Sequence, residues 1–403
     1  GVGDWRTGFP AGMMWMMYEY TGDEKWADYG RDWTNAVRAR ATASDNDTGF
    51  QIYCSYGYGL RHAAKALSDR EKRDYESVIR WGSETFTTQR YNANVGGYRS
   101  WPESAHDAYA GEFEVNIDEM MNLELPTYVA KTDGNNDLLD KVMRHSETTW
   151  SHHIYKAGDA QWEKPTSVEY VKRKPGGHYH VVEFDPGTGD VTAKRTAQGY
   201  KTESTWSRGQ SWAVYAYTML YRYTGKKEML QRAEYCFDFF MSSLKSQSDN
   251  YIAYTDFDAE VSKSHPLDTS ASAIVASAAV ELYRLTSDKK YLDAAEGMLN
   301  DLTPRPYLAE GSDFESILTR GSQAYDRGPR ARRWGTPPDS LRTPPNDRRT
   351  GPNDRGARPN DPDRRRRNRG PRAYGPGQEL GTMFGDFYFV EALLRYKQLK
   401  KGE

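Results

Sequence analysis

The sequence is poor in cysteine, in clustered metal-binding residues and in long apolar runs. Its 403 residues include two cysteines, Cys54 and Cys236, which are too few for a disulfide framework. Both lie in apolar runs that are typical of helices, so we expect buried free thiols. No CxxC pair or histidine-rich cluster indicates a metal site, and we expect no cofactor. No apolar run is long enough to span a bilayer, so we expect no membrane association.

The sequence also lacks a signal peptide and an initiator methionine. It begins at Gly1, which predicts a processed or trimmed chain, so export cannot be read from this end. We leave the compartment open and favour a periplasmic or secreted location over a cytoplasmic one.

Lysine is missing from one basic stretch. Residues 327–372 hold 15 arginines and 5 aspartates, and Pro-Asn-Asp recurs there at 345, 352 and 359. Apolar periodicity is absent, so we predict an unfolded, low-complexity insertion over 326–372. A basic run could bind nucleic acid or an anionic polysaccharide, but we favour an inert linker or an irregularity of the sequence. Because the rest of the chain is acidic, we expect no nucleic-acid partner.

Aromatic residues are abundant, with 11 tryptophans and 29 tyrosines, and such rings either fill cores or form platforms for sugars. Polar groups alternate with tryptophans over 198–212, before an apolar run that predicts a helix capped by Ser204 or Thr205. Arg208 and Trp212 share one face of that helix, because they are four residues apart. A cation and a ring at the positive end of a helix suit a sugar that carries a carboxylate. The alternative is a surface arginine packed on a core tryptophan.

A pair of helices recurs along the chain. The first member is apolar nearly all round, a tight polar turn follows, and the second member is charged with one apolar stripe. An example of such a stripe is Trp26, Tyr29, Trp33 and Val37. A helix that is apolar all round lies among other helices, and a helix with one stripe lies outside them. The apolar members span 13–20, 50–67, 120–130, 212–223 and 271–285.

Five such hairpins and a last helix over 380–399 make eleven helices, one fewer than a double ring of six hairpins needs. Because the chain starts at an inner helix, we predict an all-α (α/α)6 toroid that lacks its first outer helix. The alternative is an open helical solenoid. We expect one catalytic domain over 1–403, interrupted by the insertion. Alternating apolar residues within 156–205 predict a small β-hairpin at the mouth of the barrel.

The inner helices of such a toroid run in one direction, so their positive N-termini meet at one end. Aspartates precede or open four of these helices, namely Asp4, Asp47, Asp118 and Asp268. An aspartate at such a position is more often a helix cap than a catalytic residue. Several on one rim, beside tryptophans and Arg208, nevertheless indicate a sugar site.

Several stretches of the sequence resemble glycoside hydrolase family 88, the unsaturated glucuronyl hydrolases. They are Asp4-Trp-Arg-Thr-Gly-Phe, Asp47-Thr-Gly-Phe, Ile117-Asp-Glu-Met-Met-Asn-Leu, His180-Val-Val-Glu-Phe-Asp-Pro, Gln198-Gly-Tyr, Ser204-Thr-Trp-Ser-Arg-Gly-Gln-Ser-Trp, Asp268-Thr-Ser-Ala and Gly385-Asp-Phe-Tyr-Phe-Val-Glu-Ala-Leu-Leu-Arg. Together they cover nearly the whole chain outside the insertion. The resemblance implies the (α/α)6 fold and removal of a 4,5-unsaturated uronic acid from the non-reducing end of oligosaccharides that polysaccharide lyases release.

The implied reaction adds water across the C4=C5 vinyl ether, and the resulting hemiketal collapses. The resemblance assigns general acid–base work to Asp118 and a supporting role beside it to Asp47. A carboxylic acid that donates a proton near neutral pH needs a raised pKa, which burial or a neighbouring carboxylate supplies.

The resemblance also implies the residues that bind the substrate. Arg208 would lie near the uronate carboxylate or the hydroxyls of the sugar, and His180 and Gln198 would contact the substrate and its attacking water. For His180 the alternative is a strand residue bonded to backbone. Trp5 and Trp212 match aromatic positions around the unsaturated ring, and we expect Trp101 to supply another wall.

The sequence departs from the family at the uronate pocket and at the second sugar. Asn46 stands where the family often has histidine, and the opening motif lacks the usual tryptophan after Phe9. The loop for the second sugar is expected near 319–323, where Arg320 and Ser322 could bind a sulfate. The candidate substrates derive from glycosaminoglycans, from gellan or xanthan, or from ulvan.

Three alternatives remain at this point. The rhamnogalacturonan-directed hydrolases of family 105 share the fold and chemistry, but the segments around His180 and Arg208 favour family 88. A non-catalytic sugar-binding toroid is the second alternative, and the presence of both aspartates argues against it. A sugar epimerase would need a pair of catalytic histidines.

Overall fold

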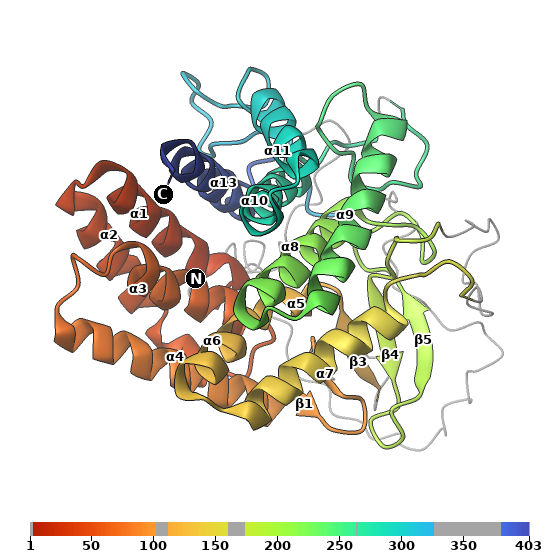
Figure 1. The fold of residues 1–403 in the computed structure, drawn as a ribbon, viewed down its shortest axis with the longest axis horizontal. Helices are drawn as coiled ribbons and strands as arrows, with labels where there is room; N and C mark the ends of the chain where they lie inside the picture. The colour runs from red at the N-terminus through yellow and green to blue at the C-terminus, as the bar shows by residue number, and fades with distance from the viewer. Residues whose placement is uncertain (1–2, 102–111, 160–173, 263–264, 326–379, 403) are drawn as a thin grey trace, which may run out of the picture.

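Six apolar helical segments pack against one another in the middle of the molecule (Figure 1). The computed structural model describes residues 3–101, 112–159, 174–262, 265–325 and 380–402, so the predicted insertion at 326–372 lies outside the described residues. The inner segments are α1 (Gly8–Thr21), η3 (Gly49–Gly57) with α3 (Tyr58–His62), α5 (Glu119–Asn122) with α6 (Glu124–Asp133), α8 (Ser207–Thr224), α10 (Thr269–Thr286) and α13 (Met383–Lys401). Neighbours contact each other in chain order, and α13 contacts α1.

Five outer helices pack on the inner segments that precede them. They are α2 (Glu24–Ala36), α4 (Asp69–Arg90), α7 (Asn136–His152), α9 (Lys227–Gln247) and α11 (Lys289–Leu302). Within the described residues the molecule therefore has six inner segments and five outer helices. This arrangement confirms the predicted (α/α)6 toroid.

Residues in the left-handed conformation end the four inner helices α1, α6, α8 and α10, each of which is followed by an outer helix. Gly22, Gly134 and Gly225 have φ angles of 70°, 67° and 66°, and Ser287 has a φ of 62°. A helix that ends in this way reverses direction within a few residues, and glycine adopts the conformation without a steric cost. The recurring polar turns of the sequence thus correspond to the tips of the hairpins.

The apolar stripe predicted for α2 is wrong in its orientation. Tyr29 and Trp33 are 52% and 46% exposed, whereas Val37, just past the helix, is buried. The buried face of α2 consists instead of Ala27, Gly30 and Thr34. Those residues are three and four positions apart, so they form one face of the helix.

The physical reason is the large Trp15 of the neighbouring α1. A Cβ at Gly30 would lie 2.6 Å from the Trp15 ring, so only glycine fits there. The indole Nε1 of Trp15 donates a hydrogen bond of 3.0 Å to Oγ1 of Thr34. The large side chain in this interface therefore belongs to α1, and the small residues of α2 allow the two helices to approach closely.

Two inner helices predicted as continuous are divided. The stretch predicted over 50–67 forms a π-helical η3 and a short α3, and the stretch predicted over 120–130 forms α5 and α6. The predicted cap of α8 is also wrong, since the helix begins after Trp206 and no side chain caps it. The first turn is held instead by the amide of Ser207, which donates to the carbonyl of Thr255 at 2.9 Å.

A three-stranded antiparallel sheet lies beside the helices (Figure 1). The predicted hairpin is confirmed as β4 (Val181–Phe184) and β5 (Val191–Arg195), and β3 (Phe113–Asn116) pairs with β4. Strand β3 was not predicted from the sequence. A second pair, β1 (Tyr91–Asn92) and β2 (Gly97–Tyr98), follows α4.

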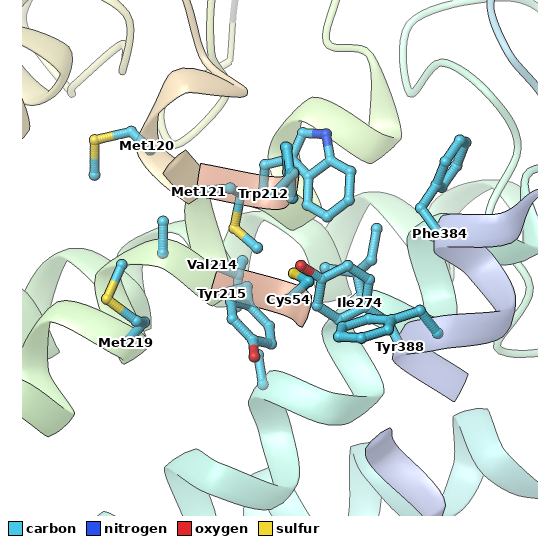
Figure 2. Packing of buried hydrophobic residues seen from close by; sticks show 14 of the residues in the cluster. Cys54, Met120, Met121, Trp212, Val214, Tyr215, Met219, Ile274, Phe384 and Tyr388 are labelled. Carbon is cyan, nitrogen blue, oxygen red and sulfur yellow. The ribbon is translucent and has the colours of Figure 1, made fainter. Parts of the chain in front are cut away.

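Aromatic and aliphatic side chains fill the centre of the inner ring. Figure 2 shows Trp212 and Tyr215 of α8 converging with Ile274 of α10 and Tyr388 of α13. The rings of Trp212 and Tyr388 are 5.4 Å apart and those of Tyr215 and Tyr388 are 5.0 Å apart, both nearly edge to face. Cys54 and Cys236 are buried free thiols, as predicted.

Charged side chains meet at the C-terminal ends of three inner helices. Glu281 of α10 forms salt bridges with Arg222 of α8 at 2.6 Å and with Arg395 of α13 at 2.8 Å. Arg395 also pairs with Glu391 at 2.9 Å. Arg222 lies fourteen residues after Arg208 on α8, which is about 20 Å along a helix. The network is therefore remote from the end where the predicted site residues lie.

Candidate active site

Four aspartates precede or open inner helical segments, and only two of them act as caps. The carboxylate of Asp268 caps α10 by accepting from the amide two residues ahead at 3.2 Å, and that of Asp4 caps in the same way, at 2.9 Å, the 3-10 turn Trp5–Thr7 that leads into α1. Asp118 stands at the N-cap position of α5 but makes no side-chain cap bond. Asp47 precedes the N-cap position of η3, and no side chain caps that helix. Helix capping thus accounts for Asp4 and Asp268 and leaves Asp47 and Asp118 for another role.

Asp118 faces His180. Oδ2 of Asp118 lies 3.4 Å from Nε2 of His180. The two residues are brought together by the sheet, because the amide of Ile117 donates to the carbonyl of His180 at 2.9 Å and so continues the pairing of β3 with β4. The Asp118 side chain is 19% exposed and that of His180 is 1% exposed. An acid that solvent can reach therefore lies against a buried imidazole.

The other ring nitrogen of His180 determines the tautomer. Nδ1 accepts hydrogen bonds from the amides of Ala197 and Gln198 at 3.1 and 3.2 Å. A nitrogen that accepts two amide protons carries a lone pair, so the proton of neutral imidazole lies on Nε2 and faces Asp118. Burial lowers the pKa of His180 and favours this neutral form. The predicted alternative was a histidine bonded to backbone. It is correct for Nδ1, whereas Nε2 faces Asp118.

Asp47 lies close to Asp118 and to a further acid. Its Oδ1 accepts a hydrogen bond of 3.2 Å from Nδ2 of Asn122 on α5, and its amide donates to Asp45 at 3.0 Å. Burial and the charge of Asp45 raise the pKa of Asp47 to about 8, and the charge of Asp118 adds to this effect. Asp47 therefore exchanges a proton near neutral pH.

Sequence reasoning missed Glu119, which follows Asp118. Its side chain is fully buried, and neither carboxyl oxygen has a hydrogen-bond partner within the described residues. Burial, followed by the neighbouring Asp47 carboxylate, raises the pKa of Glu119 well above its ordinary value. The sequence does contain a signal for this residue: Glu119 stands between Asp118 and two methionines, at the start of a stretch predicted to be an inner helix. A charged residue at such a position is a candidate for a buried acid.

Arg208 is buried and bound to the protein. Its Nη1 donates to Oδ2 of Asp268 at 2.8 Å and to the carbonyl of Ser322, and its Nη2 donates to the carbonyl of Gln323 at 2.7 Å. The guanidinium lies 4.5 Å from the Trp206 ring and is 1% exposed. The arginine therefore packs on Trp206 rather than on Trp212, and it is not a surface residue as the sequence alternative supposed.

Three other residues predicted to bind the substrate lie in or beside the same segment. Gln198 is partly exposed, and its Nε2 donates to the carbonyl of Gln323 at 2.9 Å. Ser322 is buried, and its hydroxyl donates to the carbonyl of Ala324 at 3.2 Å. Arg320 has a positive φ of 57°, and its guanidinium lies 5.6 Å from the ring of Tyr307. The structure brings Gln198 and Arg208 to this segment, away from direct contact with Asp118.

The expected aromatic walls fall into two groups. Trp101 lies beside His180, with ring centres 6.2 Å apart, and the Arg195 guanidinium is 5.6 Å from its ring. Trp5 is partly exposed and stacks on Phe384 at 5.2 Å. Trp212 is fully buried in the core (Figure 2), so its ring is not exposed to a ligand in this structure.

The described part of the chain contains no group of three or more histidine, cysteine, aspartate or glutamate side chains arranged to hold a metal ion. Among the same residues, no helix has the length and apolar character needed to cross a membrane.

Comparisons with known proteins identify the family. An unsaturated glucuronyl hydrolase of Formosa agariphila is 38% identical over 307 residues, which are 76% of this chain and 69% of that protein. An unsaturated chondroitin disaccharide hydrolase of Streptococcus pyogenes is 25% identical, over 98% of this chain and 81% of that protein. The crystal structure of an unsaturated glucuronyl hydrolase specific for heparin superposes with a TM-score of 0.75 at 28% identity, covering 100% of this chain and 88% of that one.

A family model described as glycosyl hydrolase family 76 matches residues 191–315, less than half of the chain. That segment consists largely of the hairpins α8–α9 and α10–α11. The relatives above extend over much more of the chain, and the heparin-specific structure shares its fold. This chain belongs to the unsaturated glucuronyl hydrolases, glycoside hydrolase family 88.

Proposed function

We propose that this unsaturated glucuronyl hydrolase uses Asp118 as the general acid and base that hydrates the C4=C5 bond of a terminal uronic acid. The observation that carries this assignment is the position of Asp118, which caps no helix and faces the Nε2–H of a neutral His180 at 3.4 Å. A partly exposed carboxyl beside a fixed hydrogen-bond donor suits proton transfer to a substrate carbon and from a water.

The reaction then follows from the chemistry of a vinyl ether. The Asp118 carboxyl gives its proton to C4, and the positive charge that develops is shared by C5 and the ring oxygen. A water oxygen bonds to C5 while its proton passes to the Asp118 carboxylate, which restores the acid. The hemiketal at C5 opens to a ketone, the ring oxygen takes up a proton, and the hemiacetal at C1 releases the second sugar.

His180 and Asp47 support this step in different ways. The Nε2–H of His180 is positioned to orient the Asp118 carboxylate or the attacking water. Asp47 has a pKa of about 8, so at neutral pH it can donate a hydrogen bond to a sugar hydroxyl or accept one.

We assign the remaining predicted residues by their exposure. Trp5 and Trp101, which are partly exposed, are proposed as walls against the faces of the unsaturated ring, and Gln198 as a polar contact. Arg208 and Trp212, which are buried, are proposed to act through their neighbours. Arg208 holds the segment 322–323, and Trp212 supports the aromatic residues beneath Trp5.

The proposed substrate is an unsaturated disaccharide or oligosaccharide released from a glycosaminoglycan by a lyase. Support comes from relatives named for chondroitin and heparin substrates. Arg320 is the residue proposed to meet a sulfate on the second sugar, since Ser322 is buried and bonded to backbone. Activity of Arg320→Ala on a sulfated disaccharide is expected to fall, while activity on the unsulfated analogue is retained. An equal rate on the sulfated substrate would contradict this role.

The decisive experiment follows the ultraviolet absorbance of the conjugated uronate. Wild type and Asp118→Asn are incubated with disaccharides from chondroitin, heparin, gellan, xanthan and ulvan lyases. We expect the absorbance to disappear with wild type and to persist with the variant, and the fastest substrate identifies the polymer. A folded wild-type protein that binds these sugars without changing their absorbance would favour the non-catalytic toroid.

A further inference from the structure

The second acid of the site is held by a buried amide that the reaction itself does not use. Asn122 is fully buried on α5 and makes two hydrogen bonds to the segment that precedes and begins η3. Its Oδ1 accepts from the amide of Phe50 at 2.9 Å, and its Nδ2 donates to Oδ1 of Asp47 at 3.2 Å. One amide group therefore fixes both the backbone of η3 and the side chain of Asp47.

The same helix carries Asp118, so Asn122 connects the two catalytic carboxyls. Asp118 and Asn122 are four residues apart and lie on one face of the turn. Gly49 brings the two elements together, because a Cβ at this position would lie 2.5 Å from the backbone of Asn122. The distance between Asp47 and α5 is thus set by a close backbone contact and by one side-chain hydrogen bond.

The charges around Asn122 make this bond important for the state of Asp47. The titratable and charged groups that face the pair are Asp45, Asp118, Glu119 and Arg90. The carboxyls disfavour a negative charge on Asp47, and the Asn122 amide favours it because an N–H donor stabilises the ionised form. Arg90 has the same effect through its charge.

We propose that Asn122 is a positioning residue for this hydrolase: its amide fixes Asp47 against the helix that carries Asp118 and stabilises the ionised form of Asp47. The inference rests on the proposed function for its effect on the reaction. It does not rest on that function for its effect on Asp47, which is measurable without a substrate.

The variant Asn122→Asp separates the two bonds of the amide. It keeps an oxygen that accepts from the Phe50 amide and replaces only the donor that faces Asp47. At low pH the new carboxyl is protonated and can donate in place of the amide, so we expect kcat close to that of wild type. As the pH rises, the new carboxylate repels Asp47, and we expect kcat to fall by about 100-fold relative to wild type.

Two further variants distinguish positioning from a general loss of structure. Asn122→Ala removes both bonds and is expected to lower kcat by a similar factor at every pH. Asn135→Asp is the matched control, because Asn135 caps α7 by accepting from the amide of Leu138 at 3.0 Å. The control is expected to keep the wild-type pH profile. KM of the control should stay within about twofold of wild type, because neither Asn135 nor Leu138 is proposed to contact the sugar. In the two Asn122 variants we expect kcat to change more than KM.

A carboxyl titration by carbon-13 NMR, with Asp47→Asn to assign the signal, tests the same inference without turnover. We expect the pKa of Asp47 to be higher in Asn122→Ala than in wild type. An unchanged Asp47 titration, or Asn122→Asp with the kcat of wild type across the whole pH range, would overturn the inference. An inactive wild-type protein would contradict the proposed function alone, and the titration would still decide the role of Asn122.

Discussion

At the scale of single residues, Glu119 combines burial with the absence of a hydrogen-bond partner within the described residues. A buried carboxyl that cannot be solvated costs stability wherever it would otherwise ionise. It directly follows Asp118, the proposed general acid, so this cost arises within the proposed active site.

The variant Glu119→Gln is expected to be more stable than wild type at neutral pH by roughly 1–3 kcal/mol, because a neutral amide replaces the acid. The pKa of Glu119 is raised in the folded state from an ordinary value of 4.5. Below pH 4.5 both states carry the proton and the acid costs nothing. Above it the unfolded state ionises first, so wild type loses stability as the pH rises.

Thermal unfolding of both proteins between pH 4 and 8 measures this difference, which should grow with pH. The control is Glu114→Gln, since Glu114 is paired with Arg195 and its removal should lower stability. A constant difference at every pH would mean that folding does not raise the pKa of Glu119.

At the scale of elements, two close contacts hold together the rim that carries the proposed site. One is the approach of η3 to α5 at Gly49, and the other is the attachment of the segment 319–323 to the first turns of α8 and α10. Both depend on atoms with little freedom to move, namely backbone atoms in the first contact and a buried guanidinium in the second.

The substitution Gly49→Ala is expected to destabilise the protein by about 2 kcal/mol or more and to lower kcat, because a methyl group there meets the backbone of Asn122. Gly82→Ala in α4 is the matched control. A Cβ at Gly82 would find its nearest atom at 3.4 Å, and alanine favours a helix by about 0.5–1 kcal/mol over glycine. Denaturant unfolding should show Gly49→Ala to be less stable than wild type and Gly82→Ala to be at least as stable, and kcat should fall only in Gly49→Ala.

The substitution Arg208→Lys tests the second contact. Lysine keeps the charge but has no planar fork, so it cannot reach Asp268 and two carbonyl oxygens together. We expect a loss of about 3 kcal/mol in unfolding free energy and a higher KM for the disaccharide. Wild-type KM in this variant would mean that the segment holds its conformation without the arginine.

At the scale of the whole molecule, a buried charge network closes the ring at the end remote from the site. Glu281 forms ion pairs with Arg222 and Arg395, which lie on two different inner helices. Burial alone would raise the pKa of Glu281, but the two arginines lower it to about 2. Three helices that are far apart in the sequence are thereby joined at their C-terminal ends.

We therefore expect acid to lower the free energy of unfolding of the whole toroid, so that its helices unfold together. Because the pKa of Glu281 is lowered from 4.5 to about 2, its contribution is complete above pH 4.5 and is lost as the pH falls towards 2. Near-ultraviolet circular dichroism should show cooperative unfolding in this range. Glu281→Gln should be less stable at pH 7 and should lose less stability between pH 4.5 and 2. Equal acid sensitivity of the two proteins would assign the transition to other carboxyls.

The division of the chain into helix pairs could be predicted because the signals are local. Turn residues such as Gly22 and Gly225 end an inner helix through their own backbone preference, and apolar periodicity extends over a single helix. The topology of hairpins then brings Asp47 and Asp118 to one rim, without any knowledge of the side chains between them.

The sequence by itself thus determined the toroid, the family motifs and the two aspartates proposed for catalysis. Only the tertiary structure decided which face of α2 is buried, that Arg208 binds Asp268 and backbone carbonyls, and that Asn122 and Glu119 surround Asp47. The physical reason is distance along the chain. Each of these features depends on a neighbour from another helix, and the packing of the folded ring alone brings such neighbours into contact.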